Sequence, residues 1–452
     1  MRTKLDKACI LFNVLEKRKK LKMKSRIVAN ASWIIVCRII QSILSLVVSM
    51  LTARYLGPSN FGLINYAASI VSFIAPVMYL GLSSILVQEI INHPDDEGET
   101  LGTSLFMSFI MSILCIIGII CFVSVVNAGE RETLIVCSLY SLMLLFQCID
   151  LLQYWFQAKL KSKYTSIVML IAYTLVSCYK IFLLAKGKSV YWFALSNTLD
   201  YFIIAIALLF IYRRVGSFRL RISTKRVKGL LSRSKYYIIS NLMVMVFTQT
   251  DKIMLKIMLD DSATGYYAAA VGCASLSSFI FSAIIDSMRP SIFESVKYSF
   301  DAFEDIVIKL YCIVIYLSLA QSVFLTLLAK PVILILYGEQ FLTTAKILRL
   351  VVWYTTFSYL GSVRGVWMLA TNNQRHLLSI NLVGAASNVI LNCLLIPLMG
   401  VMGAALASLL TQFFTNVVMG YIVNDIRDNN RLMVLGINPV IMKDIIKRIM
   451  KN

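Results

Sequence analysis

Twelve long apolar runs constrain this chain more than any other feature of its sequence. Each run reaches the length of about 20 residues that a helix needs to cross the hydrocarbon core of a membrane. A helix satisfies all of its backbone polar groups internally, so such runs predict transmembrane helices. The least apolar runs are 236–259, with three charges, and 345–370, which begins with two basic residues. The twelve runs are 27–51, 61–86, 102–126, 134–157, 165–185, 190–212, 236–259, 265–288, 306–329, 345–370, 377–396 and 401–424.

The composition agrees with a membrane protein and argues against an ordinary soluble enzyme. Hydrophobic residues make up 59% of the 452 residues and charged residues only 15%, whereas soluble domains carry about 25% charged residues. The ten cysteines lie at scattered spacings, and neither metal-ligand spacing nor a nucleotide-binding motif occurs. We therefore predict that the chain is not an enzyme and has no catalytic residue, bound metal or cofactor.

The positions of Lys and Arg predict the orientation in the membrane. If the N-terminus is cytoplasmic, the cytoplasmic loops and tails hold thirty-one of these residues and the opposite loops hold five. This asymmetry predicts that both termini are cytoplasmic, because positive loops stay on that side. It also explains the net charge of +21 without a nucleic-acid partner. The central loop 213–235 alone holds nine basic residues and separates six spans from six.

The predicted fold is an all-α polytopic membrane protein with about 12 transmembrane helices in two six-helix bundles. Asn438-Pro439 predicts the start of an amphipathic helix in the tail, which would lie on anionic membrane lipids; a frayed basic tail is the alternative. The expected parts are a basic cytoplasmic segment 1–26, an N-terminal bundle 27–212, a basic linker 213–235, a C-terminal bundle 236–424 and a basic cytoplasmic tail 425–452.

The two halves of the chain resemble each other. Residues 56–62 match residues 259–265 at a shift of 203, which aligns Gly62 with Gly265. Farther on, residues 155–158 match 367–370 at a shift of 212. Six spans per half is an even number, so the two halves are predicted to be parallel repeats about an axis along the membrane normal. Such an arrangement predicts a cavity between the bundles and alternating access; chance similarity is the rival explanation.

Several charged residues lie inside the predicted spans, where a charge costs about 2.5–3.5 kcal/mol and usually faces a cavity or a partner. Their surplus of cations predicts a cationic central cavity suited to a phosphate or pyrophosphate. Purely structural roles are the alternative, with Asp200 neutralising Lys180 and Asp251 offsetting Lys252. The predicted substrate-binding residues are Arg38, Lys180, Lys252 and Arg364, of which Arg38, Lys252 and Arg364 are expected to share the cavity. The predicted coupling or cavity carboxylates are Asp150, Asp200 and Asp251.

Several segments resemble polysaccharide flippases of the Wzx type, and their order covers about residues 27–424. The same superfamily also holds lipid II flippases, which usually carry fourteen spans, and multidrug exporters. The segments that carry the resemblance are 53–58, Asp150 with 155–158, 251–255, 337–341, and Asn388, Asn392 and Ile396-Pro397 with 403–405.

The resemblance implies a function in surface polysaccharide biosynthesis, such as that of O-antigen. Its members translocate oligosaccharide repeat units linked to undecaprenyl pyrophosphate across the bacterial cytoplasmic (inner) membrane. Partners would be that lipid-linked glycan and the polysaccharide polymerase and glycosyltransferases of the same pathway. One alternative is an exporter of drugs or other amphiphiles, which would need fewer cavity cations. Another is a membrane-embedded polymerase or glycosyltransferase, which typically has a longer periplasmic loop than 330–344.

Overall fold

The computed structural model describes residues 2–216, 219–373 and 375–449, and it describes the side chains of these residues except those of 2–32, 34, 35, 446, 448 and 449. Every regular element within these ranges is helical. The first half comprises α1 (Arg2–Met78), η1 (Leu82–Ser84), α2 (Leu86–Asn92), η2 (Pro94–Asp96), α3 (Glu97–Val126), α4 (Arg131–Ser141), α5 (Met143–Gln147), η3 (Cys148–Leu151), α6 (Leu152–Ala158), α7 (Ser162–Ala185) and α8 (Val190–Val215).

The second half continues with α9 (Thr224–Met258), α10 (Asp261–Ala274), α11 (Ser278–Tyr298), α12 (Phe300–Leu327), α13 (Ala329–Leu336), η4 (Glu339–Phe341), α14 (Thr344–Ala370), α15 (Arg375–Met399), α16 (Val401–Phe413), the π-helical turn η5 (Phe414–Val418), α17 (Met419–Ile422), η6 (Asn424–Ile426), α18 (Arg427–Leu435) and α19 (Pro439–Ile449).

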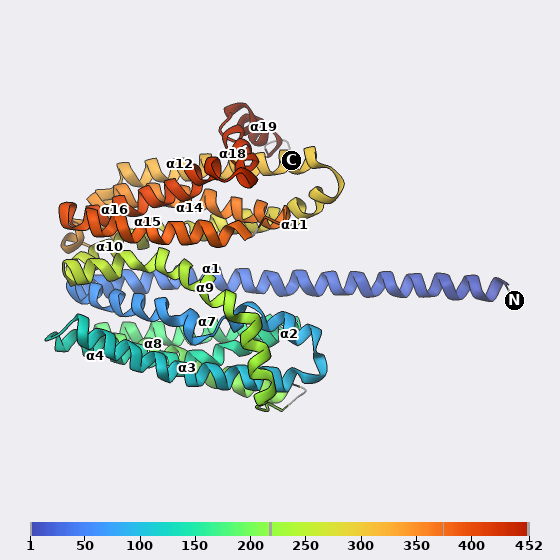
Figure 1. Cartoon of the computed structure of the whole chain (residues 1–452), viewed down its shortest axis with the longest axis horizontal. Coiled ribbons are helices and arrows are strands. Elements are labelled where there is room, and N and C mark those ends of the chain that lie inside the picture. The colour runs from blue at the N-terminus through green and yellow to red at the C-terminus, as the bar shows by residue number, and fades with distance from the viewer. Residues whose placement is uncertain (1, 217–218, 374, 450–452) are drawn as a thin grey trace.

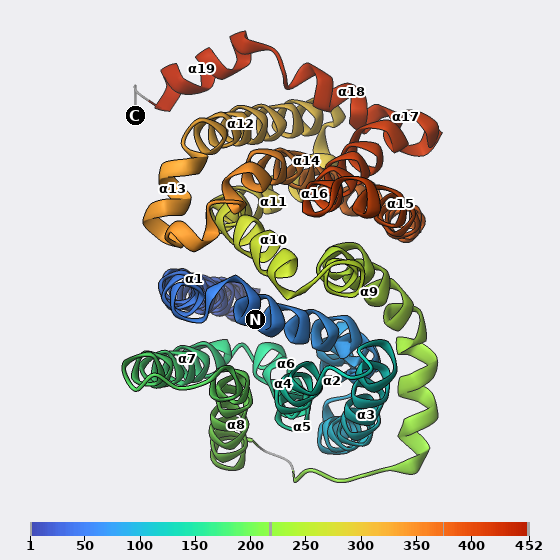
Figure 2. The same ribbon diagram turned by 90° about the vertical axis from the view of Figure 1, so that its left-hand side faces the viewer.

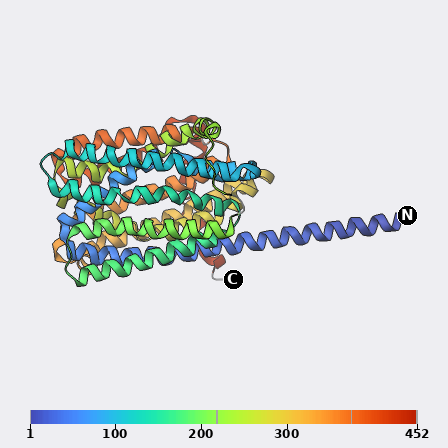
Figure 3. The same cartoon turned by 90° about the horizontal axis from the view of Figure 1, so that it is seen from below.

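The long helices run along one direction in two groups (Figure 1). One group holds α1 to α8 and the other holds α9 to α17, and the groups meet where α1 lies beside α9 and α10 (Figure 2). The start of α1, the connection between α8 and α9, and the C-terminal helices all lie toward the same end of the molecule, which we call the basic end. The first part of α1 projects beyond the bundles at this end (Figure 3). Both tails and the linker thus lie toward one end, which is the arrangement that their predicted placement on one side of the membrane requires.

The helices account for the twelve predicted spans. Within the described ranges, eight helical segments are long and apolar enough to cross a membrane, or nine if α10 and α11, which are bent by 44° relative to each other, form one span. The first candidate, Val36–Met78, contains two spans because the chain turns at Gly57, whose φ of 73° favours glycine. The remaining two are α9 and α14, with 35 and 27 residues. Their sequences are the two least apolar of the twelve runs.

The pseudo-symmetry predicted from the sequence is visible where the two halves meet at the end opposite the basic end, which we call the far end. A methyl group added at Gly62 would lie 1.8 Å from the carbonyl oxygen of Asp261. A methyl group added at Gly265 would lie 2.0 Å from the carbonyl oxygen of Pro58. Gly62 corresponds to Gly265, and Pro58 to Asp261, at the shift of 203. The two contacts are thus reciprocal, as a two-fold relation between parallel repeats requires.

The connection between the bundles is shorter than the loop 213–235, because α8 continues to Val215 and α9 begins at Thr224. The first turns of α9 lie against the N-terminal bundle. Arg226 forms an ion pair with Asp96, and Arg233 forms one with Glu89. The basic start of α9 is therefore held against the N-terminal bundle by ion pairs with the acidic residues that precede α3.

The C-terminal tail forms two helices, α18 and α19. The predicted start of α19 is confirmed: the helix begins at Pro439, and the side-chain Oδ1 of Asn438 accepts a hydrogen bond from the backbone N–H of Val440 at 3.0 Å. Of the predicted amphipathic helix, the side chains of Ile446, Arg448 and Ile449 lie outside the described ones.

Candidate functional site

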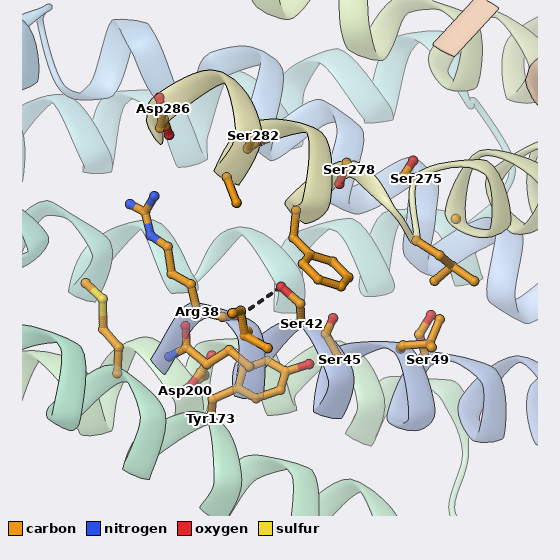
Figure 4. Close-up of a pocket in the computed structure, with 18 of the residues that line it drawn as sticks. Arg38, Ser42, Ser45, Ser49, Tyr173, Asp200, Ser275, Ser278, Ser282 and Asp286 are labelled. Atoms are coloured by element: carbon orange, nitrogen blue, oxygen red, sulfur yellow. Dashed lines mark hydrogen bonds between the residues drawn. The ribbon is translucent and has the colours of Figure 1, made fainter. Parts of the chain in front are cut away.

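A cavity of about 1010 Å³ lies between the two bundles. One wall comes from α1, η3, α7 and α8, and the other from α10, α11 and the turn between them (Figure 4). Tyr337 also belongs to the lining. The two walls thus belong to different halves of the chain, as the repeat predicts. This volume is at the upper limit of ordinary ligand pockets, which measure about 300–1,000 Å³.

Hydroxyl groups line both walls of the cavity. On α1 they follow helical spacing along one face, at Ser42, Ser45 and Ser49. On the opposite wall they come from Ser275, Ser278, Ser282 and Ser287. Each hydroxyl can donate and accept a hydrogen bond, which suits the hydroxyl groups of a sugar.

The charges of the cavity differ from the expectation. Arg38 extends into the cavity between the wall that carries Asp200 and the wall that carries Asp286 (Figure 4). Among the residues whose side chains the structure describes, the lining contains this one cation and three carboxylates, from Asp150, Asp200 and Asp286. The prediction of a cationic cavity is therefore wrong for the cavity wall itself. The sequence predicts that these charges lie at bilayer depth, but it does not predict toward which neighbouring helix each side chain points.

The cavity opens toward the basic end and is closed at the far end. Arg38, Asp286 and Ser287 at the basic end are exposed, whereas Tyr337 at the other end is only 3% exposed. Beyond Tyr337 the bundles meet at Gly62 and Gly265 without space for a methyl group. Access is therefore from the side that the positive-inside rule predicts to be cytoplasmic.

Polar contacts between the bundles reinforce the closure at the far end. Lys256 Nζ lies 2.7 Å from Glu130 Oε2 in the N-terminal bundle and 2.8 Å from Asp261 Oδ2 in its own bundle. Arg54 Nη2 donates to the carbonyl oxygens of Leu334, at 3.2 Å, and Ile335 at the C-terminus of α13. Carbonyl groups at a helix C-terminus attract a cation, because they lack partners within the helix.

Three predicted substrate-binding residues do not line this cavity. Lys180 donates to Asn197 Oδ1 at 3.3 Å, and within the described part of the chain it forms no ion pair with Asp200. Lys252 is half-buried and lines neither this cavity nor a second one in the C-terminal bundle. Arg364 lines that second cavity. The expectation that Arg38, Lys252 and Arg364 share one cavity is therefore wrong.

Asp251 is the centre of a buried polar cluster in the C-terminal bundle. Its Oδ1 accepts hydrogen bonds from the side-chain amides of Asn388, at 3.0 Å, and Asn392, at 2.6 Å. Its Oδ2 accepts from the hydroxyls of Tyr267, at 2.5 Å, and Ser408. The cluster joins α9, α10, α15 and α16 around a side chain that is 5% exposed. Its four hydrogen-bonding partners are neutral, so Asp251 does not simply offset Lys252.

Sequence reasoning missed the serine-lined walls and the composition of the Asp251 cluster. Serine is common in membrane helices, where it packs closely against neighbours, so its presence alone was no signal. Asn388 and Asn392 were noticed only through the family resemblance. Their spacing of four residues places both amides on one face of α15, which was a usable signal for a shared partner.

The fold is that of membrane transporters and flippases. A structure described as lipid II flippase MurJ in an inward closed conformation superposes with a TM-score of 0.68 at 15% identity, covering 91% of each chain. An inward-facing multidrug resistance MATE family transporter of the MOP superfamily gives 0.62 at 14% identity, over 87% of this chain and 95% of the other. The MATE multidrug transporter DinF-BH gives 0.59 at 12% identity, over 89% and 96%.

The sequence places the chain in a family. Residues 27–296, more than half of the chain, match the family described as polysaccharide biosynthesis protein. The chain therefore belongs to the polysaccharide biosynthesis protein family and is a multi-pass membrane protein with the fold of these transporters. None of the curated proteins compared with it matches.

Proposed function

We propose that the protein is a flippase for oligosaccharide repeat units linked to undecaprenyl pyrophosphate, working by alternating access in the bacterial cytoplasmic membrane. The observation that carries this proposal is the large serine-lined cavity between the bundles, open at the basic end and closed at the far end. Membership of the polysaccharide biosynthesis family supports it. Glycosyltransferases would assemble the lipid-linked substrate, and a polymerase would use it after translocation.

The cavity provides different groups for the two polar parts of such a substrate. Arg38 is the cation available for the pyrophosphate, since a guanidinium binds phosphate oxygens in a forked arrangement. The rows of serine hydroxyls on α1 and α11 would contact the sugars. The prenyl chain, which needs no polar partner, would stay in the surrounding lipid.

The carboxylates of the cavity are the proposed coupling groups. Asp150 and Asp200 line it, and each has a buried Oδ1 without a hydrogen-bond partner among the described residues. An ionised carboxylate is unfavourable there unless a proton or another cation joins it. Protonation would also remove repulsion between these groups and an entering pyrophosphate. Asp251, the third candidate, lies outside the cavity and would act through its own cluster.

A second candidate function is the export of cationic amphiphiles. It is favoured by the charge of the cavity wall, where three carboxylates face one arginine. A cationic substrate would need no protonation of Asp150 or Asp200 before binding. The two functions therefore predict opposite substrate charges for the same cavity.

Translocation assays in reconstituted proteoliposomes distinguish the flippase from the exporter of cationic amphiphiles. We expect the wild type to translocate a short-chain prenyl-pyrophosphate-linked oligosaccharide, with Arg38→Ala lowering the rate at least tenfold and Arg38→Lys less. Arg131→Ala, which changes an exposed arginine at the far end, is the matched control and should retain activity. Translocation of a cationic dye such as rhodamine, with no movement of the glycolipid, would overturn the flippase proposal.

A further inference from the structure

A second cavity lies inside the C-terminal bundle and has no assigned role. Its volume is about 280 Å³, it is lined by α9, α14, α15 and the α16–η5 segment, and it opens to the surface beside the exposed Ser362. It shares no lining residue with the central cavity. The bundle therefore contains a separate polar chamber in addition to the proposed substrate pathway.

Arg364 on α14 is the charged group of this chamber. The residue is buried, with only 4% of its surface exposed. Nη2 donates to Asn416 Oδ1 at 2.5 Å, whereas Nη1 is buried without a hydrogen-bond partner. Within the described part of the chain, no carboxylate lies within ion-pair distance of Arg364. A buried guanidinium with one neutral partner leaves its positive charge uncompensated, which is strongly unfavourable in a low-dielectric interior.

The surrounding residues hold Arg364 in position instead of neutralising it. Asn416 lies in η5, the π-helical turn, and its Nδ2 donates to Gln412 Oε1 at 2.6 Å. Asn416 can approach α14 because residue 361 is glycine; a methyl group there would lie 2.3 Å from Asn416 Oδ1. Single π-helical turns are frequent at functional sites. The local sequence thus fixes the arginine beside an open space.

The remaining lining suits an oxyanion. Ser358 and Asn381 bring a hydroxyl and an amide donor to the chamber from two helices, α14 and α15. The hydroxyl of Ser362, also in the lining, donates to the carbonyl oxygen of Ser358 at 3.2 Å and offers its oxygen as an acceptor. A phosphate group is small compared with the chamber and accepts hydrogen bonds on several oxygens at once. Chloride would satisfy the charge but would leave most of these donors without a partner.

We propose that this chamber is a binding site for a phosphate-class oxyanion, held by Arg364 and the neighbouring hydroxyl and amide donors. The source is either free inorganic phosphate or the headgroup of an anionic membrane lipid. The bound anion would supply the counter-charge that the chain does not provide and would tie α14 to η5. This site goes beyond the proposed transport function, since it lies outside the central cavity.

The test is the thermal unfolding midpoint of the purified full-length protein as inorganic phosphate is titrated at constant ionic strength against chloride. A ligand that binds only the folded state raises the midpoint as its concentration passes its Kd. We expect a saturable rise for the wild type and its loss in Arg364→Gln, which removes the charge but keeps a polar side chain. Arg131→Gln, which changes an exposed arginine at the far end that lines neither cavity, is the matched control and should keep the rise.

Lipid additions distinguish the source of the anion. A rise in micelles with phosphate alone identifies free phosphate, and a rise only when phosphatidylglycerol is added identifies a headgroup; both support the site. Asn381→Leu reduces the volume of the chamber without changing the Arg364–Asn416 contact. It should raise the anion concentration needed for half of the rise in midpoint at least tenfold, and it provides the test if Arg364→Gln does not fold. The proposal is overturned if neither anion stabilises the wild type, if chloride acts as strongly as phosphate, or if both variants respond like the wild type. Loss of flipping in Arg38 variants would have no bearing on this result.

Discussion

Gly265→Ala should open the far end of the molecule. The added methyl group would lie 2.0 Å from the carbonyl oxygen of Pro58, whereas ordinary van der Waals contact begins near 3.4 Å. The two helices must therefore separate locally by about 1.4 Å, the difference between these distances. The atom that obstructs the methyl group belongs to the backbone, so no side-chain rotation relieves the contact. Overpacking of this kind destabilises a packed interface by about 1–3 kcal/mol.

This energy applies to the closed arrangement, because the contact joins the two bundles. A difference of about 1–3 kcal/mol corresponds to a shift of roughly 5- to 150-fold toward the open arrangement. Hydrogen–deuterium exchange of the peptides around residues 58–66 and 261–270 reports this opening. Gly62→Ala should produce a similar effect by the reciprocal contact. The double variant should be less than additive, since both changes separate the same pair of helices.

Gly118→Ala is the matched control, because a methyl group there meets nothing within 4 Å. Both substitutions replace a helical glycine and gain the same intrinsic helix propensity, at most about 1 kcal/mol. The difference between the variants therefore isolates the contact between the bundles. If Gly265→Ala exchanges as slowly as Gly118→Ala in both peptides, the close approach is not what holds the far end closed.

Two further predictions concern buried and interfacial carboxylates. Asp251→Ala should lower the unfolding midpoint strongly, because four hydrogen-bond donors lose their acceptor and each buried donor left unpaired costs on the order of 1–3 kcal/mol; a midpoint within about 1–2 °C of the wild type would contradict the hydrogen-bond network. At Glu130, burial opposes ionisation, but hydrogen bonds from Lys256 and Thr133 outweigh it and lower the pKa below the usual glutamate range. The stabilisation is therefore complete at neutral pH and is lost as the pH falls through that lowered pKa. The gap in unfolding midpoint between wild type and Glu130→Gln should be constant from about pH 7 to 5 and close below about pH 4. The gap should be small, because the ion pair of a carboxylate that is 46% exposed contributes only about 0–1 kcal/mol to the free energy of unfolding. A gap that persists unchanged at about pH 3 would refute the ion pair.

The sequence by itself determined the architecture at the level of spans and halves. The length of an apolar run decides whether a helix crosses the membrane, and the Lys and Arg of a loop decide on which side it lies. Both properties are local in the chain, so they can be read without knowing any contact. The repeat also followed from the sequence, since the match of Gly62 with Gly265 marked the place where the two halves later proved to meet.

The grouping of the polar residues was decided only by the tertiary structure. Arg38 and Arg364 have the same charge and both lie inside predicted spans, yet one lines the central cavity and the other a chamber in the C-terminal bundle. Asp251 meets Asn388 and Asn392 from a helix more than a hundred residues away. Position along a span fixes the depth of a side chain in the membrane. The direction in which it points relative to other helices depends on how those helices pack and rotate against one another, which no single segment encodes.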